Sequence, residues 1–144
     1  MAHYETSVTT HHSPAEAFAM MADMTRFADW DPGVQSATQT SGTEPGLGAA
    51  YRLVVNGVGP APATTLTYEV NEYEPDRRYR AVAKARFFSS DDIVTVTAEG
   101  QGSTVKYEAD LYLNGPLKVL DPLLGPIFNK IGDAAAEGLK DFLG

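Results

Sequence analysis

Tyrosine hydroxyls and one carboxylate are the groups of this chain that could do chemistry in a closed space. Strand alternation directs Tyr51, Tyr68, Tyr79 and Tyr107 toward the same side of the chain as its apolar residues. A tyrosine hydroxyl is costly to bury without a partner, so four of them indicate a hydrogen-bond network or a partly wet cavity that holds a ligand. Asp92 shares this inward parity. In an apolar pocket its pKa would be raised, and it could act as a general acid or base.

Asp92 also has a plainer interpretation. The pair Asp91-Asp92 follows two serines, and such a polar run is typical of a solvated turn before a strand. Both interpretations remain open from the sequence.

Other chemistries find less support. His11 and His12 are adjacent and would point oppositely in a strand, and with His3 they give no converging set of metal ligands, so we expect no metal. The loop Gly57–Pro60 lacks the lysine and the following helix of a phosphate cradle. The sequence has no nucleophile elbow of a serine hydrolase, and we expect no cofactor.

Composition narrows the class of protein further. The chain has 144 residues, no cysteine and a net charge of −8. Its 11 basic residues form no stripe, so we expect no nucleic-acid partner. No apolar run approaches the roughly 20 residues of a membrane span. We expect one domain over residues 1–144 in the cytoplasm, and the sequence leaves the oligomeric state open.

Two short helices should follow a first strand over residues 3–10. Ser13 is a good N-cap, Pro14 suits the first helical position, and Glu16 completes a capping box. A second short helix is expected over about residues 25–30, and Asp31-Pro32-Gly33 should end it.

Period-two alternation then runs from about residue 34 to residue 115 and predicts about six antiparallel strands with one apolar face. Ala81, Ala83 and Ala85 place small side chains on that face, which leaves volume beneath the sheet. The expected breaks between strands are residues 42–48, 57–62, 74–76, 89–91 and 100–102.

The last segment returns to a helical period after Asp121-Pro122, with a broad apolar face, and Gly125-Pro126 should kink or interrupt this helix near its start. This order predicts an α+β fold in which a curved antiparallel sheet of about seven strands (β-α-α-β6-α) wraps a long C-terminal helix. A twisted sheet and a straight helix leave a cavity between them unless large side chains fill it, and a plain filled core is the alternative.

The chain resembles the START and birch-pollen-allergen superfamily (SRPBCC), and its polyketide cyclase/dehydrase branch most closely. The resemblance lies in residues 13–18 followed by 23–30 and ending on Trp30, in residues 68–75, and in residues 102–107 and 115–117 before the long helix. It implies a helix-grip fold with a hydrophobic tunnel between sheet and helix.

The resemblance also implies a function. Members bind lipid-like or polyketide-like molecules, and we expect a hydrophobic or amphipathic small-molecule ligand in the cavity. The alternative is a polyketide cyclase/dehydratase enzyme that acts in the same cavity, with Tyr51 and Asp92 as the candidate catalytic residues. Such enzymes resemble one another in a cavity tryptophan, tyrosine and arginine, but Arg52, Arg78, Arg80 and Arg86 fall on the outward parity. The expected ligand-binding residues are Phe18, Trp30, Tyr51, Leu53, Tyr68, Tyr79, Phe87, Val96, Tyr107, Leu120, Leu124, Phe128 and Ile131.

Overall fold

A computed structural model describes residues 2–57, 62–85 and 88–144, apart from the side chains of residues 117, 118, 121 and 124. Its elements are β1 (Ala2–Thr10), α1 (Pro14–Ala22), the 3₁₀ turn η1 (Met24–Arg26), α2 (Phe27–Trp30), β2 (Val34–Ser41), β3 (Ala50–Val55), β4 (Thr64–Glu74), β5 (Arg78–Lys84), β6 (Phe88–Glu99), β7 (Gly102–Leu113), the 3₁₀ turn η2 (Gly115–Leu120) and α3 (Asp121–Leu143). The predicted element order is confirmed.

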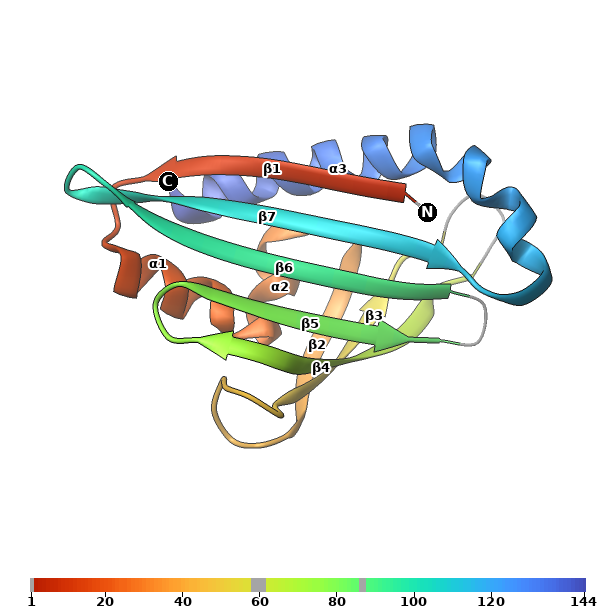
Figure 1. The fold of residues 1–144 in the computed structure, drawn as a ribbon, viewed down its shortest axis with the longest axis horizontal. Coiled ribbons are helices and arrows are strands. Elements are labelled where there is room, and N and C mark those ends of the chain that lie inside the picture. The colour runs from red at the N-terminus through yellow and green to blue at the C-terminus, as the bar shows by residue number, and fades with distance from the viewer. Residues whose placement is uncertain (1, 58–61, 86–87) are drawn as a thin grey trace.

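The seven strands form one antiparallel sheet in the order β1-β7-β6-β5-β4-β3-β2. From β2 to β7 each strand pairs with the next one along the chain, and β1 pairs with β7. The two edge strands are therefore β1 and β2, which flank the first helices in the sequence. Figure 1 shows the sheet curling so that β2 and β3 pass behind β5 and β6. The concave side of this curl is the apolar side.

The first helices form where the capping residues predict. The Ser13 side chain accepts a hydrogen bond from the Glu16 backbone N–H, and Asp23 caps the turn η1 in the same way through Thr25. Their apolar side chains, among them Phe18, Met21 and Phe27, are buried against the inner face of the sheet, with α1 packed on β6 and β7 and with η1 and α2 packed on β2. These helices therefore close one part of the concave side.

The second half of the long helix α3 runs beside β1 and in the same direction, from Asp133 at Tyr4 to Leu143 at Thr10, while its first half extends past the start of β1 (Figure 1). The Thr10 hydroxyl donates to the Leu143 carbonyl at 2.6 Å and fixes the end of the helix. The helix continues through Pro126, so Gly125-Pro126 does not interrupt it, and the alternative that the sequence offers, a kink, stays a prediction. Pro126 is the sixth residue of α3, past the N–H groups that lack partners at a helix start, so it removes one backbone hydrogen bond of the helix.

One strand boundary also differs from the sequence prediction. Ser89, Ser90 and Asp91 were expected to form a break, but all three lie inside β6 and pair with β5 and β7. Ordinary turn chemistry was outweighed here by sheet pairing on both sides. No helix in the described part of the chain is long and apolar enough to cross a bilayer.

Candidate functional site

A buried polar cluster lies on the inner face of β6 and β7. Strand alternation on β6 turns Ser90 and Asp92 inward, and on β7 it turns Tyr107 and Ala109 inward. Asp92 stands opposite Ala109 in the register, so Tyr107 is its diagonal neighbour and a long side chain can reach it. The small Ala109 leaves the room for this contact.

Asp92 is held by two hydroxyl donors. The Tyr107 hydroxyl donates to one carboxylate oxygen at 2.5 Å and the Ser90 hydroxyl to the other at 3.0 Å. Burial raises the pKa of Asp92 to about 7, although these two hydrogen bonds oppose the shift, and the charges of Asp31 and Asp91 raise it further. The solvated-turn interpretation of Asp92 is therefore wrong, since its exposed fraction is 4%.

Two further groups extend the cluster. The buried Tyr68 side chain is hydrogen-bonded to Ser90, and burial holds the pKa of Tyr68 well above its ordinary value. Asp31, directly after α2, accepts a hydrogen bond from the Gly33 backbone N–H at 2.8 Å, while desolvation raises its pKa. The cluster thus contains one carboxyl, Asp92, that can exchange a proton near neutral pH, beside the tyrosines Tyr68 and Tyr107, which stay protonated.

A small pocket lies between this cluster and α3. It encloses about 50 Å³ and is lined by Tyr4, Thr6, Trp30, Asp31, Tyr107, Ala109, Phe128, Ile131, Gly132, Ala135, Ala136 and Leu139. A water molecule needs roughly 10–15 Å³ of such space, so the pocket has room for a few waters but not for a lipid or a polyketide. A pocket therefore lies between sheet and helix as predicted, but it is smaller than the ligand-sized cavity that the sequence predicts.

The indole of Trp30 forms one wall of the pocket. Its ring packs edge-on against Tyr107 and beside Phe27. Its Nε1 is buried and has no hydrogen-bond partner among the described residues. A buried donor without an acceptor is costly, and an acceptor that reaches it recovers this cost.

Tyr51 occupies a different place from the pocket. It is fully buried on β3, its hydroxyl also lacks a partner among the described residues, and burial raises its pKa to about 12. The pocket-lining set does not include it. The structure therefore does not bring together the two candidate catalytic residues, Tyr51 and Asp92, around one pocket.

The arginines face away from the cluster, as alternation predicts. Arg78 and Arg80 bind Glu72 on the outer face, and Arg80 also pairs with Asp91 at 2.5 Å. Arg52 is exposed, and Arg86 lies outside the described residues. No arginine among the described residues lines the pocket.

The other expected ligand-binding residues fall into three groups. Trp30, Tyr107, Phe128 and Ile131 line the pocket. A second group is buried elsewhere in the core between the sheet and the helices: Phe18, Tyr51, Leu53, Tyr68, Tyr79 and Val96. Leu120 is 43% exposed on η2, while Phe87 and the Leu124 side chain lie outside the described residues.

Sequence reasoning missed several lining residues. Tyr4 and Thr6 alternate with exposed residues on β1, and that parity was the available signal. The sequence assigns Asp31 only to the end of a helix. Gly132 and Ala136 lie on the α3 face beside larger residues, where only the packing of α3 on β1 identifies them.

The first half of α3 and the turn before it expose apolar side chains. Val119, Leu123 and Ile127 are 78%, 66% and 42% exposed. The second half is buried through Ala135, Leu139 and Leu143. The C-terminal half of the helix is therefore packed against the rest of the protein, while the N-terminal half leaves apolar side chains exposed to solvent.

Comparison with known proteins identifies the class. The model of the family described as polyketide cyclase / dehydrase and lipid transport matches residues 1–144. A comparison with curated proteins gives no match.

Solved structures with a similar fold span nearly the whole chain. A protein of Thermus thermophilus has a TM-score of 0.75 at 16% identity, covering 99% of this chain and 95% of its own. A START superfamily protein of Mycobacterium smegmatis has a TM-score of 0.72 at 12% identity, with coverages of 99% and 97%. The Zhui aromatase/cyclase of a Streptomyces species has a TM-score of 0.74 at 12% identity, with coverages of 98% and 90%. At these identities the likeness shows the fold, which is the predicted helix-grip fold.

Proposed function

The chain belongs to the polyketide cyclase / dehydrase and lipid transport family, and from this premise we propose that it binds a hydrophobic or amphipathic small molecule between the sheet and α3. The observation that carries the proposal is the unpaired Nε1 of Trp30, a buried donor in a wall of the pocket, with no partner among the described residues. The occupant would be an apolar molecule of the lipid or polyketide kind with an oxygen acceptor that takes this hydrogen bond. Its apolar part would lie against Phe128, Ile131 and the small residues of α3.

Such a ligand requires a wider pocket than the 50 Å³ seen here. The C-terminal half of α3 is fixed, because a Cβ at Gly138 would overlap the Trp30 carbonyl oxygen and the helix end is held by Thr10. The N-terminal half has fewer buried anchors and exposes Leu123 and Ile127. We infer that the first half of α3 moves outward to admit the ligand and buries these exposed side chains against its apolar part.

A thermal-shift panel of fatty acids, steroids and aromatic polyketides tests the binding. At a free concentration 100 times its dissociation constant, a ligand adds about 2.7 kcal/mol to the free energy of unfolding. Ala136→Leu should abolish the shift, because the larger side chain fills the pocket that Ala136 lines.

Ala134→Leu is the matched control, since Ala134 is exposed on the same helix and its variant should keep the shift. A stabilising ligand whose effect is equal in both variants would place its site elsewhere and contradict the proposal.

A second candidate function is proton-transfer catalysis of the cyclase or dehydratase type in the same pocket. The pair Asp92–Tyr107 favours it, since Tyr107 lines the pocket and donates to a carboxyl whose pKa is about 7. Such a pair can remove and return a proton near neutral pH, and groups of this kind contribute roughly 10²–10⁴-fold to rate.

Turnover of a poly-β-keto thioester by the wild-type chain and by Asp92→Asn tests the catalytic candidate. The variant should lose at least about 10²-fold in kcat while the dissociation constant of the substrate changes little. Equal kcat in both proteins would exclude Asp92 from the chemistry.

A further inference from the structure

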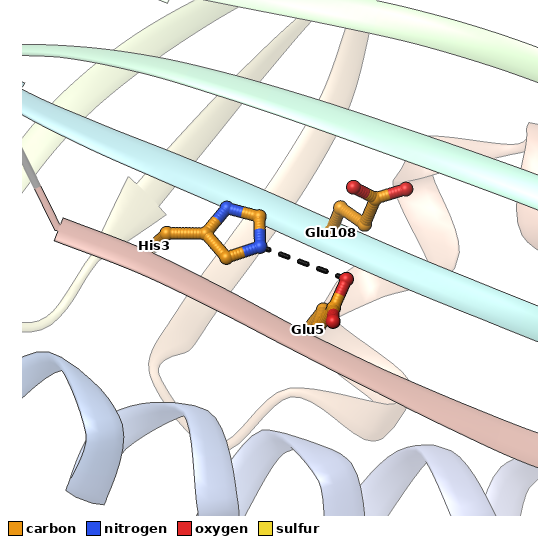
Figure 2. Close-up of side chains that lie close together, drawn as sticks. All are labelled: His3, Glu5 and Glu108. Carbon is orange, nitrogen blue, oxygen red and sulfur yellow. Dashed lines mark ion pairs between the residues drawn. The ribbon is translucent and has the colours of Figure 1, made fainter.

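Three possible metal ligands meet on the outer face of the sheet, where β1 pairs with β7. His3 and Glu5 are two residues apart on β1 and share this face, and Glu108 of β7 stands directly opposite Glu5. One ligand atom from each of the three lies within 4.8 Å of the other two. Figure 2 shows the imidazole and both carboxylates gathered above the two strands, although the strands come from opposite ends of the sequence.

The imidazole is oriented from behind by a fourth residue. His3 Nδ1 lies 2.5 Å from an Asp110 carboxylate oxygen, and Asp110 is the residue opposite His3 in the register. This hydrogen bond leaves Nε2 on the side of Glu5, 3.7 Å from its carboxylate. A histidine whose second nitrogen is held by a carboxylate is the usual arrangement of a metal-ligating histidine in proteins.

The local charge also favours a cation. Glu5 and Glu108 are like charges at directly opposed positions, which destabilises a sheet unless a cation lies between them. The Lys106 ammonium takes part of this role at 3.5 Å from each carboxylate. With Asp110, three carboxylates face one lysine, so two negative charges remain when His3 is neutral.

We propose that His3, Glu5 and Glu108 form a surface site for a divalent transition metal of the Zn²⁺ type, with Asp110 as the positioning residue and Lys106 as the cation that the metal displaces. One imidazole nitrogen and two carboxylate oxygens suit Zn²⁺, and water completes the coordination. The side chains are partly exposed and can close to ligand distances of about 2.0–2.2 Å. The bound metal would join the first strand of the chain to the last.

Isothermal titration of the full chain with Zn²⁺ at about pH 8 tests the site, with neutral His3 as the ligand. One ion should bind per chain. His3→Gln and Glu108→Gln should each weaken binding at least about tenfold, and Asp110→Asn should weaken it about tenfold although it supplies no ligand. Lys106→Gln should bind Zn²⁺ several-fold more tightly, because it removes the competing cation.

The double variant His11→Gln/His12→Gln is the matched control, since these histidines stack on each other away from the site, and it should bind as the wild type does. Binding that keeps its wild-type strength in His3→Gln, or that is no tighter in Lys106→Gln, would overturn the proposal. The test of the metal site is independent of the test of ligand binding in the pocket, because Ala136→Leu should leave Zn²⁺ binding unchanged.

Discussion

Asp92 combines burial with only hydroxyl partners, and this combination sets its chemistry. No positive charge among the described residues offsets its own, so the carboxyl keeps a proton until about neutral pH. The neighbouring aspartate, Asp91, has a different environment, since it faces outward and is paired with Arg80.

Asp92→Asn should change how stability depends on pH. Because the pKa of Asp92 rises from 3.8 to about 7 on folding, the folded state holds a proton that the unfolded chain releases, so the free energy of unfolding falls as pH rises from about 4 to about 7. Asparagine carries no such proton. In urea unfolding, the variant should be more stable than the wild type at about pH 8, by an amount on the order of a few kcal/mol, and should show little gain at about pH 4.

Asp29→Asn is the control for this measurement, because Asp29 is exposed and its variant should follow the wild-type pH profile. An Asp92→Asn profile parallel to that of the wild type would contradict the raised pKa.

Two buried tyrosines offer a second comparison at this scale. The Tyr79 hydroxyl donates to the Met21 carbonyl at 2.6 Å, whereas the Tyr51 hydroxyl has no partner among the described residues. Tyr79→Phe should therefore cost about 1–2 kcal/mol in the free energy of unfolding, and Tyr51→Phe should be neutral or stabilising. Chemical denaturation of both variants measures these changes. If both variants lose the same free energy of unfolding, Tyr51 is hydrogen-bonded and the prediction is wrong.

At the scale of elements, α3 depends on glycines that let it approach its neighbours. Gly132 lies on the Tyr4 ring and Gly138 on the Trp30 carbonyl, and a Cβ at either position would overlap these atoms. A backbone oxygen cannot give way as a flexible side chain can. The close contact at Gly138 thus sets the position of Trp30, and with it one wall of the pocket.

Gly138→Ala should therefore destabilise the chain by about 1–3 kcal/mol, although alanine is the better helix former. Thermal unfolding measures this loss. The control is Glu137→Ala at an exposed position of the same helix, which should stay within about 0.5 kcal/mol of the wild type. A Gly138→Ala chain as stable as its control would show that α3 can withdraw from α2 at no cost.

The secondary-structure elements also show which features of the fold could be predicted from the sequence. The caps Ser13 and Asp23 and the period-two strands depend on local chemistry, so they could be predicted residue by residue. The inward direction of Asp92 followed from alternation alone. Its burial did not, because Ser89 and Ser90 suggested a turn and only pairing with β5 and β7 makes them strand.

The pocket was harder to predict for a related reason. Which alanines of α3 face it depends on how the helix lies along β1, and this contact joins the two ends of the chain. No residue of β5 lines the pocket, so the small Ala81 and Ala83 do not open onto it as the sequence predicts.

At the scale of the whole molecule, the sheet separates two environments. Its inner face holds the protonatable cluster and the pocket, while its outer face carries charged networks centred on Arg80 and on His3. Both proposals therefore use one sheet but different sides of it. We propose that the ligand enters on the inner side, between β7 and α3.

Trp30 is the single tryptophan of the chain and lines the pocket, so its fluorescence reports this place directly. The wild-type chain would be titrated with a ligand that raises its melting temperature while the emission of Trp30 is followed. Ligand entry at this place predicts a saturable change in Trp30 emission with the same dissociation constant as the stabilisation, and its loss in Ala136→Leu. Saturable stabilisation with unchanged Trp30 emission would place the ligand outside the pocket and contradict the claim.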